Sequence, residues 1–109
     1  MSRKVISTNQ APAAIGPYSQ AIATDNLLFV SGQLPINPTN GAMIEGDIGA
    51  KTQQILKNAT AIAKEAGTDL AQVIKTTIFL TDLADFQEVN TAYTAFFPEA
   101  PPARSTVQV

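Results

Sequence analysis

The chain has 109 residues, of which 45% are hydrophobic and 15% charged, and it contains no cysteine, histidine or tryptophan. This length and composition predict a single globular domain with its own hydrophobic core. The missing residue types exclude disulfide scaffolds, thiolate and imidazole metal sites, cysteine nucleophiles and Ser-His-Asp catalysis. The formal net charge of −2 argues against binding to a nucleic-acid backbone, which needs a clustered basic surface.

The sequence predicts a cytoplasmic protein with no membrane partner. No apolar run approaches the ~20 residues of a membrane-spanning helix. Residues 1–7 carry two charges, but no long apolar segment follows them as it would in a signal peptide.

The N-terminal part predicts a β-hairpin preceded by a short strand. Residues 4–7 alternate as a first strand, and the proline-rich segment 11–17 is a loop. Residues 18–23 and the strongly apolar 27–33 are the two hairpin strands, joined by the turn residues of 25–26.

The middle of the chain predicts a long loop, a helix and a strand. Residues 35–46 are polar and interrupted by Asn-Pro and Asn-Gly pairs, which favour loops. Asp47 is a plausible N-cap for a helix that continues to Ala66 with an apolar stripe on one side. Gly67 stands where a left-handed residue commonly ends a helix. The β-branched and aromatic run 73–80 then predicts a strand.

The C-terminal part predicts a second helix and a last strand. An aromatic stripe with helical spacing runs through residues 82–97, and a proline follows it. Pro101-Pro102 leads rigidly into a strand over 103–109. The whole order predicts an α+β fold in which two helices cover one face of a mixed sheet.

Apolar side chains occupy both faces of the predicted strands 27–33 and 73–80. Two helices on one side leave the other face uncovered, and a large exposed apolar face is rare in a monomer. Loops are one possible cover. The interpretation we favour is a homo-oligomer whose sheets pack together.

Two polar residues stand out against apolar or rigid surroundings. Asn90 lies on the aromatic side of the second helix, where a buried amide is either a structural or interface group or a ligand contact. Arg104 follows the two prolines at the start of the last strand. It either reaches solvent or presents a fixed guanidinium fork to a carboxylate.

Smaller signals accompany these two residues. Gly32, inside an apolar strand, indicates a bulge or a close backbone approach. Ser31 and Thr106 offer hydroxyl groups to a ligand, although both also suit strands without one. Tyr18 follows Gly-Pro in a rigid loop, where its phenol either packs or donates to a small anion.

Several segments in the same order resemble the RidA family of reactive-intermediate (enamine/imine) deaminases. They are AAIGPYSQA at 13–21, FVSGQLP at 29–35, VIKTTIFLTDL at 73–83, the stretch from 85–97 and PARST at 102–106.

The resemblance implies a chorismate-mutase-like α+β fold assembled as a homotrimer, with sites in the clefts between subunits. It implies a 2-iminobutanoate/2-iminopropanoate deaminase that hydrolyses intermediates such as 2-aminoacrylate to 2-keto acids and ammonia. No metal and no organic cofactor is expected, and the predicted ligand is a small 2-imino or 2-keto acid.

The resemblance also assigns residues to the site. The position of Arg104 pairs with the substrate carboxylate, and we predict Arg104, Tyr18 and Thr106 as catalytic residues. The residues predicted to bind the substrate match positions along the pocket of the family. They are Tyr18, Ser31, Gly32, Phe86, Asn90, Arg104, Ser105 and Thr106.

Two departures from the family pattern leave other functions open. Thr106 replaces a cysteine found in many members. The chain reaches Val109 without the further strand and the glutamate with which members continue, so a single RidA-like domain over 1–109 lacking that strand is expected. The alternative is a non-catalytic module that binds or senses small carboxylic acids. A ribonuclease, also claimed for relatives, is opposed by the acidic charge balance and the missing histidine.

Overall fold

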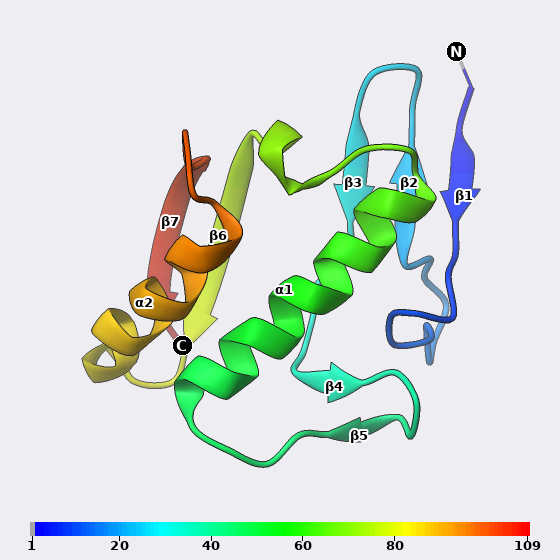
Figure 1. Ribbon diagram of the computed structural model, residues 1–109. Helices are drawn as coiled ribbons and strands as arrows, with labels where there is room; N and C mark the ends of the chain where they lie inside the picture. Colours follow the sequence, from blue (N-terminus) through cyan, green and yellow to red (C-terminus); the bar gives the residue numbers. More distant parts are fainter. Residues whose placement is uncertain (1) are drawn as a thin grey trace.

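The computed structural model describes residues 2–109, and its first sheet contains three antiparallel strands (Figure 1). These are β1 (Lys4–Ile6), β2 (Ala21–Ala23) and β3 (Leu28–Val30). β2 pairs with both neighbours, so the predicted hairpin and first strand are confirmed, with shorter strands than the sequence indicated. Within residues 2–109, no helix is both long and apolar enough to cross a membrane.

The first helix, α1 (Ile48–Glu65), begins and ends where its capping residues predict. The Asp47 side chain accepts a hydrogen bond from the backbone N–H of Ala50 at 2.8 Å, which satisfies one of the free donors of the first turn. Gly67, one residue after the C-cap Ala66, has a φ of 84°. This left-handed conformation is accessible to glycine without steric cost, so the helix ends here.

The prediction of a plain loop over residues 35–46 is wrong. The segment contains a small antiparallel pair, β4 (Ile36–Asn37) and β5 (Ala42–Met43). Its turn is held by the side chain of Asn40, which accepts from the N–H of Ala42 at 2.9 Å. Gly41 adopts a φ of 71° in the same turn. Strands of two residues are too short to show an alternating pattern of apolar and polar residues. The Asn-Gly pair, which favours a hairpin turn, is therefore the only sequence signal for them.

The C-terminal part alternates short 3-10 turns with regular elements. In chain order these are η1 (Leu70–Gln72), β6 (Lys75–Leu80), η2 (Leu83–Asp85), α2 (Phe86–Phe96) and β7 (Ala103–Gln108). The predicted helix over 82–97 is therefore a 3-10 turn followed by α2, because Asp82 caps the turn by accepting from the N–H of Ala84 at 2.9 Å.

β6 and β7 run parallel, with Thr76 opposite Arg104 and Ile78 opposite Thr106. The prediction of one mixed sheet needs correction, since residues 2–109 form three separate sheets. β3 and β6 each have one edge without a strand partner in this part of the chain. β3 and β6 are not paired with each other, and Figure 1 shows them separated, with α1 crossing in front.

The predicted uncovered apolar face is confirmed. Both helices lie on one side of the strands (Figure 1), and Phe29 and Phe79 on the other side are 60% and 65% exposed. Phe29 stands opposite Ile22, and Phe79 opposite Val107, so apolar rows cross both sheets. The accessible surface is 7260 Å², whereas a compact monomer of this length exposes about 5,800 Å².

The interior contains two hydrophobic clusters, and α1 contributes to both. Ile62 belongs to the cluster under β1 and β2, and Leu56 belongs to the cluster with Tyr93 and Phe97 of the C-terminal part. Between them lies Asn58, only 1% exposed. Its Nδ2 donates to the carbonyls of Leu34 at 3.3 Å and Ile36 at 2.9 Å. This amide ties the chain after β3 to the helix.

We predict that Asn58→Ala lowers the free energy of unfolding by about 2–3 kcal/mol, because it leaves two carbonyls without their buried donor. Gln54→Ala is the matched control. It removes the bond from Gln54 to Asn58 Oδ1. Because Gln54 is only half-buried, water can reach the vacated acceptor, and the loss should be smaller than for Asn58→Ala. Urea unfolding followed by circular dichroism measures both, and equal losses would contradict the role given to Asn58.

Candidate functional site

Arg104 is the second residue of β7 and is held by the backbone of a parallel strand pair. The N–H of Ala103 donates to the carbonyl of Ile74 at 3.1 Å, directly after the two prolines. Side chains alternate along a strand. Arg104 and Thr106 are accordingly half-buried on one face, and Ser105 is exposed on the other.

Two aromatic rings of α2 lie against the guanidinium of Arg104. Its Cζ is 5.1 Å from the ring centroid of Phe86 and 5.1 Å from that of Tyr93. These residues are seven apart, so their positions are separated by about 10.5 Å along the helix axis. The guanidinium therefore lies between the two rings, and Arg104 does not extend freely into solvent.

Tyr93 is fixed from the far side. Its phenol oxygen is 2.6 Å from Oγ1 of Thr76 on β6, and its ring centroid is 4.6 Å from that of Phe97. The sequence pattern placed Tyr93 in the helix core stripe and did not reveal its contact with Arg104. The seven-residue spacing from Phe86 is the signal that could have done so.

Buried polar atoms without partners mark the surroundings of Arg104. Within residues 2–109, Oδ1 of Asn90 and Oγ1 of Thr106 are buried and have no hydrogen-bond partner. Asn90 lies between Phe86 and Tyr93 in the helix, and Thr106 is two residues beyond Arg104 on the same face of β7. Because buried polar groups in folded proteins are nearly always paired, these atoms point to a missing polar partner at this place.

A cavity of about 540 Å³, here called the Arg104 cavity, opens beside these residues. Arg104, Asn90 and Tyr93 line one part of it, and the loop residues Glu99 and Pro102 line another. It therefore combines a cation, an amide, a carboxylate and apolar walls, which is the composition of a pocket for a small polar ligand.

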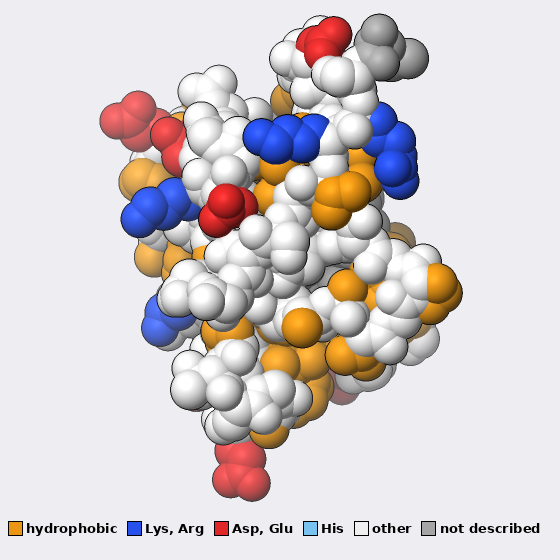
Figure 2. Space-filling view, turned by 90° about the vertical axis from the view of Figure 1, so that its right-hand side faces the viewer, with side chains coloured by type: hydrophobic (Ala, Val, Ile, Leu, Met, Phe, Trp, Pro, Cys, Tyr) orange, Lys and Arg blue, Asp and Glu red, His pale blue; other side chains and the backbone are white. Residues whose placement is uncertain are grey.

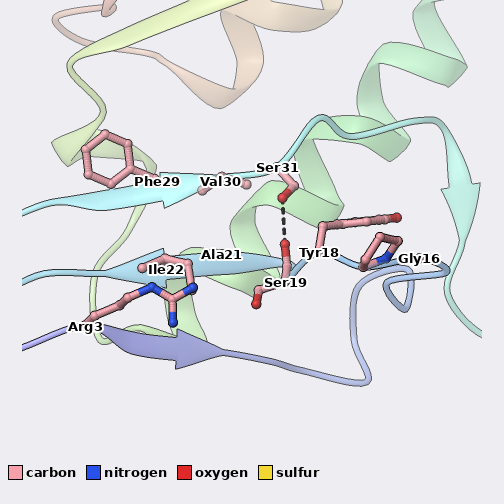
Figure 3. Close-up of a pocket in the computed structure, with 10 residues that line it drawn as sticks. Arg3, Gly16, Tyr18, Ser19, Ala21, Ile22, Phe29, Val30 and Ser31 are labelled. Carbon is pink, nitrogen blue, oxygen red and sulfur yellow. Dashed lines mark hydrogen bonds between the residues drawn. The ribbon is translucent and has the colours of Figure 1, made fainter.

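Tyr18 and Ser31 line a different cavity of about 570 Å³, here called the Tyr18 cavity (Figure 3). It lies over β2 and β3 and includes Arg3 and the ring of Phe29. Oγ of Ser31 donates to the carbonyl of Ser19 at 2.6 Å, which joins the end of β3 to the loop that carries Tyr18.

Gly32 follows Ser31 beside this cavity, and a Cβ added there would meet no atom within 4 Å in the described chain. Its φ is not positive. Neither a close approach nor a positive-φ bulge within residues 2–109 accounts for the glycine.

Gln20 is a residue of this region that the sequence patterns did not single out. Its buried Nε2 lies near the carbonyls of Thr8, Ala11 and Pro12 at 3.0, 3.2 and 2.8 Å. Its Oε1 accepts from the N–H of Thr8 at 2.7 Å. One side chain thus holds the loop that leads to Tyr18, and only its position next to the apolar β2 hinted at this.

The structure divides the predicted site residues into two groups. Arg104, Asn90 and Phe86 are brought together at α2 and β7. Tyr18 and Ser31 lie at the other cavity, and neither of these two cavities in residues 2–109 contains residues of both groups. The predicted site residues are therefore divided between two places on the described chain.

Comparisons with known proteins identify the family. A family model described as Endoribonuclease L-PSP matches residues 8–109. The chain belongs to the RidA (L-PSP) family. A RutC family protein of Sinorhizobium fredii is 54% identical over 95% of this chain and 82% of its own length.

A mouse protein named 2-iminobutanoate/2-iminopropanoate deaminase is 47% identical over 98% of this chain and 79% of its own length. The crystal structure of E. coli TdcF with bound serine shares 40% identity and a TM-score of 0.92. That match covers 97% of this chain and 85% of TdcF. The α+β fold of this RidA-family chain is therefore that of solved relatives.

We predict that Asn90→Ala changes the free energy of unfolding by less than about 1 kcal/mol, because its buried oxygen leaves no protein partner unpaired. Thr76→Val should cost about 1–3 kcal/mol, because it removes the partner of the buried phenol of Tyr93. Thermal and urea unfolding of both variants test this. A larger loss for Asn90→Ala than for Thr76→Val would show that Asn90 is a structural amide.

Proposed function

We propose that this protein hydrolyses small 2-imino and 2-enamino acids, such as 2-aminoacrylate, to 2-keto acids and ammonia. The single observation that carries the proposal is Arg104, whose guanidinium contacts two aromatic rings at the wall of a cavity. A planar, permanently charged fork suits a carboxylate. The name of the mouse relative supports this choice of substrate class.

The reaction demands little chemistry from the protein. The enamine takes a proton on its terminal carbon and becomes the iminium ion, which is the protonated imine. Water then adds to the carbon of its C=N bond. The resulting carbinolamine transfers a proton to nitrogen, its C–N bond breaks, and ammonia leaves as the C=O bond forms. Since the substrate is already reactive, holding it in orientation beside a placed water supplies much of the acceleration.

The unpartnered polar atoms suit this sequence of steps. In the proposal, Arg104 binds the carboxylate, and Oδ1 of Asn90 accepts a hydrogen bond from the substrate nitrogen. The hydroxyl of Thr106 contacts the attacking water. Each group then gains the partner that residues 2–109 do not provide.

The second half of the site would come from a neighbouring copy in a homotrimer. Tyr18, Ser31 and Gly32 would face the Arg104 cavity of an adjacent subunit, and the glycine would leave room for that approach. The divided cavities and the exposed apolar sheet face both support this arrangement. In the proposal, Ser105 contributes its backbone, since its side chain lies on the opposite face from Arg104.

A binding or sensing role without turnover is the second candidate. The relative TdcF was crystallised with bound serine, and the same Arg104 cavity would hold such an amino acid by its carboxylate. The description of the family model names an endoribonuclease, but the charges of this chain do not favour binding to a nucleic-acid backbone. Figure 2 shows Lys and Arg side chains interspersed with Asp and Glu on the face in view, and the net charge is −2.

We predict that Arg104→Ala weakens binding of 2-ketobutyrate by roughly 10- to 100-fold and abolishes imine turnover, because a charge-assisted fork is lost. Arg104→Lys should be intermediate, since it offers a point charge. Calorimetry measures binding, and ammonia release in a mixture of serine and a serine dehydratase measures turnover.

The two candidate functions separate in the same experiment. Binding by the wild type without faster ammonia release than in buffer selects the sensing role. Unchanged 2-ketobutyrate affinity in Arg104→Ala would show that the carboxylate is held elsewhere, and the site assignment would be wrong.

A shared site predicts complementation between two inactive variants. Arg104→Ala and Tyr18→Ala should each lack activity alone. In each mixed trimer, about a third of the subunit junctions would combine an intact Arg104 with an intact Tyr18, which is about a quarter of all junctions when the two chains mix equally. We expect co-expressed chains to regain a corresponding fraction of activity, and sedimentation equilibrium to give a mass of three chains. No recovery in confirmed mixed trimers would place the whole site in one chain.

A further inference from the structure

We propose that Phe86 and Tyr93 form an aromatic clamp that orients the guanidinium of Arg104 before any ligand arrives. The clamp is a positioning device: the two rings act through Arg104 and set its readiness for a carboxylate. For the ligand class, this inference rests on the proposed function. For the geometry, it rests on the contacts of the described chain alone.

Both rings lie within cation–π distance of the guanidinium. Cζ of Arg104 lies 5.1 Å from each centroid, within the ~6 Å at which a cation is attracted by a ring face. A guanidinium is planar, and its N–H groups point outward in that plane. Contact with a ring face uses none of the N–H donors of the guanidinium, so these stay available for a bidentate contact with a carboxylate.

The clamp is tied to the strand that carries Arg104. Thr76, whose Oγ1 is 2.6 Å from the phenol oxygen of Tyr93, pairs in register with Arg104 across the β6–β7 ladder. Tyr93, Thr76 and Arg104 thus form a closed set of contacts between α2 and the strands. Tyr93 is buried, whereas Phe86 is 37% exposed, so Phe86 is the ring that can be changed with less damage to the core.

The consequence is an arginine that has already lost its side-chain freedom. An unclamped arginine gives up rotamer entropy when it binds an anion, and this opposes binding. A clamped one has given it up during folding. The arrangement also explains why Lys would be a poor substitute, since an ammonium group has no planar faces to fit between two rings.

Side-chain ¹H–¹⁵N spectra of the unliganded protein test the clamp directly. The sequence has two arginines, Arg3 and Arg104, so two Nε–Hε signals are expected and Arg3 serves as an internal reference. Protons over ring faces are shifted upfield. The Arg104 signal, identified by its loss in Arg104→Lys, should lie upfield in the wild type.

Variants at Phe86 provide a matched pair. Phe86→Tyr keeps the ring and should keep the upfield shift. Phe86→Leu removes the ring. It should move the Arg104 signal towards the position of a free arginine and weaken 2-ketobutyrate binding about 5- to 10-fold. Tyr93→Phe keeps its ring and should keep the shift as well.

The outcomes distinguish the clamp from the proposed function. An Arg104 signal at the ordinary position in the wild type, or one unchanged in folded Phe86→Leu with unchanged affinity, overturns the clamp. A wild type that binds no 2-ketobutyrate overturns the proposed ligand class. In that case the position of the Arg104 signal in the spectra still tests whether the clamp exists. If Phe86→Leu does not fold, Phe86→Met removes the ring while keeping an apolar side chain and gives the same reading.

Discussion

The structure depends on one helix that is buried at two places along its length. α1 places Ile62 in the cluster beneath β1 and β2 and Leu56 in the cluster with Tyr93. These residues are six apart, or about 9 Å along the axis. Because no hydrogen-bond ladder joins the N-terminal sheet to β6 and β7 within residues 2–109, hydrophobic contact through α1 is what holds the two parts in place. Asn58 lies between the two contact points, and its hydrogen bonds hold the segment after β3 against the same helix.

Because both helices pack on one side of the strands, apolar side chains on the opposite side stay exposed to water. With α1 and α2 on one side, the rings of Phe29 and Phe79 remain exposed on the other. Burial of such rings is worth about 25 cal/mol for each Å² removed from water. The same arrangement keeps the Tyr18 cavity and the Arg104 cavity apart. In the proposed trimer, one association would cover the apolar face and bring the two half-sites together.

The chemistry follows from what the composition leaves available. With no histidine and no cysteine, the usual acid, base and nucleophile of enzymes are missing. In the proposed function, recognition depends on a permanently charged arginine, and turnover depends on orientation of an already reactive substrate. The aromatic clamp, the unpartnered oxygens of Asn90 and Thr106 and the loop held by Gln20 all contribute geometry. None of them needs to change its charge during the reaction.

The sequence by itself determined the helices, most of the strands and the family. Local signals carried these predictions: the cap at Asp47, the glycine at position 67 and the two prolines before residues 103–109. Arg104 and Asn90 could be singled out for the same reason, as polar groups in rigid or apolar settings. Such features depend on neighbours a few residues away, so they can be read along the chain.

Only the tertiary structure decided how these elements meet. It separated the expected single sheet into three and placed the small β4–β5 pair in a predicted loop. It also moved Ser105 away from Arg104, set Phe86 and Tyr93 against the guanidinium, and divided the site residues between two cavities. The separation of the sheets, the contacts of Phe86 and Tyr93 with Arg104 and the division between two cavities depend on distances between segments far apart in sequence. Those distances are set by the packing of α1 and α2 against the strands, which local residue patterns do not encode.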